Sequence, residues 1–308
     1  MNRKIIYELN ALYREPMQVT GYEFGEGEKS VCVVGSLRGN EIQQMFTCNK
    51  LIQRLKKLEQ QNRIVEGKSI LVLPCVNTYS MNIGKRFWPT DNTDINRMFP
   101  GYNEGETTQR IAAGIFEVIK DYGIGIQFAS NYMSGRFLPH IRMMQTGFED
   151  IETAKKFEFP YVIRRNTRPF DTTTLNYNWQ IWETRAFSVY TTDTDEIDAK
   201  SAADAVKGIE QMLNKEGILH SSVNGGYHYN SRVLCDDNLL SVRCREAGIY
   251  ENKVDIGEEV CKGQLLAEIT DPYEGMVLEQ LVAPADGTVF FQHKAPLIYA
   301  STTAIKLV

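Results

Sequence analysis

Short apolar runs alternate with segments of helical periodicity over the first 220 residues, and this alternation constrains the fold more than any other feature. The apolar runs are brief, rich in β-branched residues and bounded by turn residues, as buried strands are: SVCVVGS, SILVLPCVN, IGIQFAS, YVIRR and AFSVYTT. Residues 40–60, 105–123 and 198–218 carry apolar side chains at three- and four-residue spacing, which indicates helices. Strands that alternate with helices predict a parallel or mixed sheet covered on both faces.

The C-terminal part of the chain has a different sequence pattern. It shows no helical period, and glycines separate short apolar runs at positions 248, 257, 263, 275 and 287. This pattern predicts a second, all-β domain, and the domain boundary is expected at Gly225 and Gly226, giving domains 1–225 and 226–308. The segment DIGEEVCKGQLLAEITDP and the following VLEQLVAPADGTVFF resemble the barrel of biotinyl and lipoyl carrier domains. Carrier domains present a lysine at a hairpin tip, whereas this chain has Met276, Val277 and Leu278 there, so we expect a barrel without cofactor attachment.

Composition narrows the class of protein. The net charge of −5 argues against a nucleic-acid partner, because phosphate contact normally requires a basic surface. No apolar run is long enough to span a membrane, and the N-terminus lacks the apolar core of a signal peptide, so we expect a cytoplasmic protein without a membrane partner. The six cysteines show no CxxC spacing, which favours buried, reduced thiols over a metal site or a disulfide framework.

Two segments gather groups that could carry chemistry. In VCVVGSLRGNE a predicted strand ends at a glycine turn that places Arg38 and Glu41 before a helix, the position at which open α/β sheets bind ligands. The segment NIGKRFWPTDNTDINRMFPGYNEGETTQ is a long polar loop, and such loops are usually functional. It holds Arg86, Asp91, Asp94, Asn96 and Arg97. A solvated turn is the alternative for this loop.

Four segments together indicate a family: VGSLRGNE, LPCVNTYSMNIGKRFWPTDNTDINRMFPG, GIQFASNYMSGRFLPHIRMM and AFSVYTTDTDEID. In their order and spacing the chain resembles the aspartoacylase and succinylglutamate desuccinylase family, which is related to the zinc carboxypeptidases. The resemblance implies an α/β/α sandwich around a mixed sheet, followed by a small all-β, barrel-like domain. It also implies a zinc-dependent deacylase or amidohydrolase that acts on N-acyl amino acids or similar small carboxylates.

Carried over residue by residue, the resemblance divides into two parts. The substrate-binding part is present: Asn96 and Arg97 match the Asn-Arg pair of the family, with Arg142 as a further substrate-binding candidate. Arg86 is a candidate for both substrate binding and catalysis, and Tyr190, at the position of the family's catalytic glutamate, is a second catalytic candidate. In the metal part only Glu41 matches, because other residues stand at the two family histidines and at the catalytic glutamate. These residues are Arg38, Gln127 and Tyr190.

The replaced ligands bear directly on zinc. A guanidinium has no free lone pair and an amide is a poor ligand beside imidazole, whereas catalytic zinc normally has three protein ligands. We therefore expect no bound zinc, although the family uses it. Our hypothesis is that Arg38 replaces the cation and pairs with Glu41, because an isolated buried carboxylate would be costly. In the alternative, Arg38 points to solvent.

Two function classes are compatible with the sequence. One is an amidohydrolase with altered chemistry, and the other is a catalytically lapsed member that binds a small carboxylate ligand or a protein partner. His140 is expected to be structural or to contact substrate, and a homo-oligomer is compatible with the sequence. Further arginines could line the pocket or form a solvated face. They are Arg136, Arg164, Arg165 and Arg168.

Overall fold

A computed structural model describes residues 1–10, 15–130, 134–220 and 230–308, which form two compact units. Unit 1 consists of Met1–Ser130, Pro139–Thr191 and Asp195–Leu234. Unit 2 consists of Asn131–Leu138, Thr192–Thr194 and Cys235–Val308. The boundary expected at Gly225 and Gly226 lies outside the described residues. Two short segments of the N-terminal part therefore belong to the C-terminal unit.

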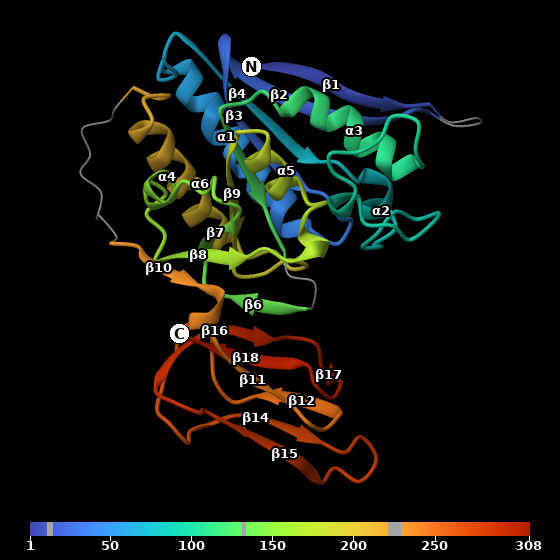
Figure 1. The fold of residues 1–308 in the computed structure, drawn as a ribbon, viewed down its shortest axis with the longest axis vertical. Helices are drawn as coiled ribbons and strands as arrows, with labels where there is room; N and C mark the ends of the chain where they lie inside the picture. The colour runs from blue at the N-terminus through green and yellow to red at the C-terminus, as the bar shows by residue number, and fades with distance from the viewer. Residues whose placement is uncertain (11–14, 131–133, 221–229) are drawn as a thin grey trace. The chain divides into compact units, whose positions relative to one another are not determined.

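Unit 1 is built on a nine-stranded mixed sheet (Figure 1). In spatial order its strands are β1 (Asn2–Leu9), β2 (Met17–Gly25), β4 (Gly67–Cys75), β3 (Gly27–Ser36), β5 (Ile124–Phe128), β9 (Arg185–Tyr190), β7 (His140–Gln145), β8 (Tyr161–Asn166) and β10 (Arg232–Cys235). The central strands β4, β3, β5 and β9 are parallel, and β7 runs antiparallel to β9. The register pairs Val34 with Gln127, Gln127 with Ser188 and Ser188 with Arg142.

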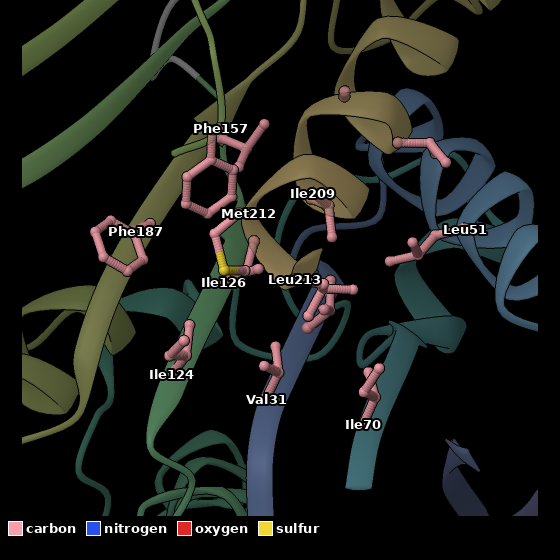
Figure 2. Close-up of a cluster of buried hydrophobic side chains, with 14 of the residues drawn as sticks. Val31, Leu51, Ile70, Ile124, Ile126, Phe157, Phe187, Ile209, Met212 and Leu213 are labelled. Atoms are coloured by element: carbon pink, nitrogen blue, oxygen red, sulfur yellow. The ribbon is translucent and has the colours of Figure 1, made fainter. Parts of the chain in front are cut away.

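The central strands β4, β3, β5 and β9 are buried on both faces, which explains why each contains a largely apolar run. On one face Val31 and Ile126 pack against Leu51 of α1 (Ile42–Gln60) and Ile209 of α6 (Ala199–Lys215), as Figure 2 shows. Because successive strand residues point to opposite faces, Cys32, Val34 and Gln127 lie on the other face. The short helix α4 (Ile151–Lys155) contributes Ala154 to the first cluster.

The second face of the sheet carries the functional candidates. It is covered by α3 (Thr107–Ile119) and α5 (Leu175–Ile181), whose buried Ile115 and Trp179 pack against Val34. The loops on this side include α2 (Thr78–Asn82) and the 3₁₀ turns η1 (Ile95–Arg97) and η2 (Pro169–Asp171). We call it the α5 face.

Unit 2 contains two antiparallel sheets. One comprises β11 (Leu240–Arg243), β18 (Thr303–Leu307), β16 (Gly287–His293), β13 (Glu259–Val260) and β6 (Gly135–Phe137). The other comprises β15 (Val277–Val282), β14 (Leu265–Thr270), β12 (Gly248–Asn252) and β17 (Leu297–Ile298), and the turn η3 (Asp236–Asn238) precedes β11. Leu266, Val289 and Ile305 are among the residues of its separate core.

The predicted fold class is confirmed: a mixed sheet between helical layers is followed by an all-β part, which consists of two sheets and no single closed barrel in the described residues. All six cysteines are free, and four of them are buried, whereas Cys235 is half-buried and Cys261 exposed. Among the described residues, no helix is long and apolar enough to cross a membrane.

Candidate functional site

The turn between β3 and α1 forms the centre of the candidate site. Glu41 occupies the N-cap position of α1, but its side chain does not cap the helix. One carboxylate oxygen, Oε2, instead accepts hydrogen bonds from the backbone N–H groups of Leu37, at 2.9 Å, and Arg38, at 3.1 Å. Glycine is required at position 39, because a Cβ there would lie 2.2 Å from the carbonyl oxygen of Lys85. The Glu41 carboxylate thus stabilises the turn by hydrogen bonds within it, and the turn packs closely against the polar loop at Lys85.

Arg38 lies inside this turn and not in solvent, with only 5% of its surface exposed. Its Nη1 donates to Glu41 Oε1 at 2.9 Å, so the expected pair is present. Its Nε and Nη2 donate to Asp94 Oδ2 at 3.0 and 2.8 Å. Burial by itself lowers the pKa of Arg38, but the carboxylates of Glu41 and Asp94 outweigh that effect and raise the pKa overall. The guanidinium is permanently charged and fully engaged by protein carboxylates.

Asp94 reaches Arg38 because η1 positions it. Its Oδ1 accepts from the backbone N–H of Asn96 at 3.0 Å, which caps the turn and leaves Oδ2 for Arg38. Ser130, which directly follows β5, donates its hydroxyl to Glu41 Oε1 and accepts from Arg38 Nη1 at 3.3 Å. The sequence suggested a neutral Arg38–Glu41 pair. With Asp94 included, one positive and two negative groups leave a net charge of −1.

Gln127 continues this polar layer along the α5 face. Its Nε2 donates to Asn96 Oδ1 at 3.2 Å, and both side chains are buried. Two residues earlier, Gly125 makes room for the indole of Trp179, because a Cβ there would lie 2.6 Å from that ring. An indole therefore fills the space that a side chain at position 125 would occupy, and Gln127 is fixed by an amide partner.

Arg142 and Tyr190 form a second part of the site, on neighbouring strands. Arg142 Nη1 donates to the Tyr190 hydroxyl at 3.0 Å, and its guanidinium carbon lies 4.3 Å from the centre of the Tyr190 ring. His140 is fully buried and stacks on the same ring, with centroids 4.5 Å apart. Arg142 is only 8% exposed, its Nε has no hydrogen-bond partner, and no carboxylate of the described residues lies within ion-pair distance of it.

Asn176 of α5 is a site residue that the sequence did not reveal. It is buried, and neither polar atom of its side-chain amide has a hydrogen-bond partner among the described residues. The backbone N–H of Leu175 donates to Asn96 Oδ1 at 3.4 Å, so α5 begins level with Gln127. One turn later, Gln180 Nε2 donates to the carbonyl of Met144 at 3.1 Å.

These contacts set the direction of α5 across the sheet. One helical turn and two strand residues each span about 5–7 Å. Gln180 contacts Met144, Asn176 precedes Gln180 by one helical turn, and Arg142 precedes Met144 by two strand residues, so we infer that Asn176 lies near Arg142. Two buried polar side chains without full hydrogen bonding therefore lie near each other.

The remaining predicted residues are only partly brought together. The backbone of Arg86 accepts from Gly39 N–H at 3.0 Å, which places its segment beside Arg38, while its half-buried guanidinium lies 5.5 Å from the centre of the Phe87 ring. The side chain of Arg97 contacts η2: its Nη1 donates to the carbonyl of Phe170 and lies 3.5 Å from Asp171.

The described residues do not fit a catalytic zinc ion. They contain no group of three or more histidine, cysteine, aspartate or glutamate side chains arranged to hold a metal. Glu41, to which the resemblance assigned the remaining ligand position, already accepts hydrogen bonds on both oxygens, and a guanidinium lies directly against it. A second cation at that carboxylate would be repelled by Arg38.

Comparison with known proteins identifies relatives over nearly the whole chain. A model of the succinylglutamate desuccinylase/aspartoacylase catalytic domain matches residues 27–214. An N-alpha-acetyl-L-2,4-diaminobutyric acid deacetylase from Halomonas elongata is 25% identical over 264 residues, covering 82% of this chain and 73% of the relative.

Two solved structures show the same fold. A succinylglutamate desuccinylase from Silicibacter sp. TM1040 superposes with a TM-score of 0.81 at 18% identity, and the ectoine utilization protein EutE (DoeB) from Ruegeria pomeroyi, with product bound, gives 0.80 at 19%. Each comparison covers 99% of this chain and 94% of the other.

Proposed function

Because the chain belongs to the succinylglutamate desuccinylase/aspartoacylase family, we propose that it binds a small carboxylate of the N-acyl amino acid class on the α5 face and does not hydrolyse it by zinc chemistry. The observation that carries this proposal is the buried guanidinium of Arg142, which has no carboxylate partner among the described residues. Relatives that are named as a deacetylase of N-acetyl-2,4-diaminobutyric acid and as succinylglutamate desuccinylases support the ligand class.

Buried polar groups that lack a hydrogen-bond partner destabilise the protein without a ligand. A buried polar atom without a hydrogen bond costs about 1–3 kcal/mol, and a buried unpaired charge costs more. Arg142 Nε and the Asn176 amide are such groups, and we infer above that they lie near each other. A ligand carboxylate satisfies the guanidinium with charge-assisted hydrogen bonds. An amide such as that of an N-acyl group offers both a donor and an acceptor to Asn176.

The metal part of the site supports binding without zinc hydrolysis. Arg38 supplies a positive charge beside Glu41. Its guanidinium donates hydrogen bonds to the carboxylates of Glu41 and Asp94, which already neutralise it. Such a cation stabilises the turn and is not available to polarise an amide carbonyl. Arg38 therefore replaces the zinc ion of the family only as a positive charge that balances Glu41. It does not replace the zinc ion as a Lewis acid.

An amidohydrolase with altered chemistry is less well supported. It would need a general base within reach of the ligand. Glu41 already accepts hydrogen bonds from two backbone N–H groups, Arg38 and Ser130, and the Tyr190 hydroxyl accepts one from Arg142. Both groups that could have taken this part are thus engaged within the protein.

Calorimetric titration with N-acetyl-2,4-diaminobutyrate and N-succinylglutamate tests the proposal. The Arg142→Gln variant should bind either compound at least about tenfold more weakly, because a charge-assisted contact is lost. Arg110→Gln removes an exposed arginine of α3 and serves as the matched control, with affinity unchanged. Product formation should stay at background with and without added zinc. Equal affinity in Arg142→Gln, or zinc-dependent turnover abolished by Glu41→Gln, would contradict the proposal.

A further inference from the structure

The guanidinium groups of two arginines approach one carboxylate near η2, and a third arginine lies against the neighbouring Phe170. We call Arg97, Arg165 and Arg168, together with Asp171 and Phe170, the arginine cluster. Asp171 is 2% exposed and accepts from Arg165 Nε at 3.3 Å and from Arg165 Nη2 at 3.2 Å. Its Oδ1 also lies 3.5 Å from Arg97 Nη1. The guanidinium groups of Arg97 and Arg165 therefore approach the same oxygen atom.

Arg168 joins this group through Phe170. The guanidinium carbons of Arg97 and Arg168 lie 5.3 and 5.9 Å from the centre of the Phe170 ring. The backbone N–H of Arg168 donates to Asp171 Oδ2 at 3.2 Å, so the buried carboxylate also fixes the turn that carries this arginine. Cation–π contact with an aromatic ring restricts the positions of both guanidinium groups.

The arginine cluster has more positive charge than its own carboxylate can balance. Three guanidinium groups and one carboxylate leave a net charge of +2, and no other described carboxylate lies within ion-pair distance of these arginines. The neighbouring Arg164 differs, because it is paired with Glu149 at 2.8 Å. The arginines remain accessible: the side chains of Arg97 and Arg165 are 31% and 22% exposed, and Arg168 is exposed.

We propose that the arginine cluster binds a doubly charged oxyanion of the phosphate type. Its excess charge matches a dianion, and planar guanidinium forks suit the several oxygen atoms of a phosphate group. The buried Asp171 holds the arginines in place beforehand, which reduces the ordering cost of binding. The cluster is formed by residues other than Arg142 and Asn176, so this site does not depend on the carboxylate site proposed above.

Titration with inorganic phosphate, followed by calorimetry at two pH values, tests this site. The second ionisation of phosphate has a pKa of about 6, so binding should be tighter at pH 8 than at pH 5.5, whereas sulfate, a dianion at both values, should bind alike. Arg165→Gln and Arg168→Gln should each weaken phosphate binding about tenfold. Arg164→Gln is the matched control, because Glu149 already neutralises that arginine.

The outcomes distinguish the arginine cluster from Arg142 as the binding site, and inorganic phosphate from a phosphate ester as the ligand. Phosphate binding that survives in Arg142→Gln supports the cluster, and binding that disappears there would place the anion at Arg142 and overturn the proposal. Glycerol phosphate, titrated in parallel, identifies a phosphate ester as the ligand if it binds at least as tightly as inorganic phosphate, and the free ion if only inorganic phosphate binds. Unchanged affinity in both Arg165→Gln and Arg168→Gln, or no binding of either anion, would refute the site. Circular dichroism of each variant verifies its fold.

Discussion

Replacing Arg38 with methionine should lower the free energy of unfolding of unit 1 by about 3–5 kcal/mol at neutral pH, because it breaks a buried ion pair from one side. The variant loses a charge-assisted hydrogen bond to Glu41 and two to Asp94. Glu41 is 1% exposed and keeps its two backbone N–H donors and Ser130, which limits the loss. The side chain of Asp94 is 13% exposed and regains some hydration.

Thermal and urea unfolding, followed by circular dichroism, measure this effect. In a unit of this size the loss corresponds to a fall in the midpoint of about 10 °C. Arg54→Met is the matched control: Arg54 makes an equally short bidentate pair with Glu210, but its side chain is 41% exposed, so the loss should stay below about 1 kcal/mol.

A second variant isolates the cause. In Arg38→Met combined with Glu41→Gln the stranded charge is gone, so the double variant should be more stable than Arg38→Met alone. An Arg38→Met protein as stable as the parent, or no more destabilised than Arg54→Met, would refute the reasoning that the guanidinium neutralises a buried carboxylate.

The other predictions concern the same unit. Arg38→His combined with Gln127→His should bind zinc measurably in calorimetry, since position 38 lies beside Glu41 and position 127 lies beside Asn96. A folded variant without zinc affinity would mean that the backbone geometry is unsuitable. Gly125→Ala should lower the unfolding free energy by about 1–3 kcal/mol in urea titrations, whereas Gly123→Ala, whose nearest contact is at 3.5 Å, should cost less; equal effects would contradict the packing argument. Despite the opposing effect of burial, Lys156 and Arg185 lower the pKa of Glu216. Glu216→Gln should therefore destabilise the protein at pH 7, and the difference from the parent should shrink progressively as the pH falls below the ordinary glutamate pKa of about 4.3; a pH-independent difference would contradict this.

The periodic segments of the sequence predicted the central strands and the long helices, because apolar spacing reflects local burial. Helices α1, α3 and α6 and strand β5 lie within predicted segments, and strands β3, β4, β8 and β9 overlap predicted segments but extend one to three residues beyond them. The strands β1 and β7 were not predicted. β1 is mostly exposed at a sheet edge, and β7 alternates apolar with polar residues of the site, so neither is a continuous apolar run.

Within the site, sequence reasoning was most successful where the partners are close along the chain. Arg38 and Glu41 are three residues apart, and their pairing could be inferred from the cost of a buried charge. Asp94 is 56 residues from Arg38 and was identified only as a polar loop residue. The packing of Trp179 into the space at Gly125, and the inferred position of Asn176 near Arg142, depend on where α5 lies across the sheet, which no local pattern specifies.

The metal content of the purified protein tests the central claim most directly. We predict far less than one zinc ion per chain by elemental analysis after purification without chelator, because Arg38 lies against Glu41, the one residue that the resemblance assigned as a zinc ligand. Adding zinc before gel filtration should not raise that value. One zinc ion per chain in the parent protein, reduced to background by Glu41→Gln, would contradict the account that a guanidinium stands in place of the metal.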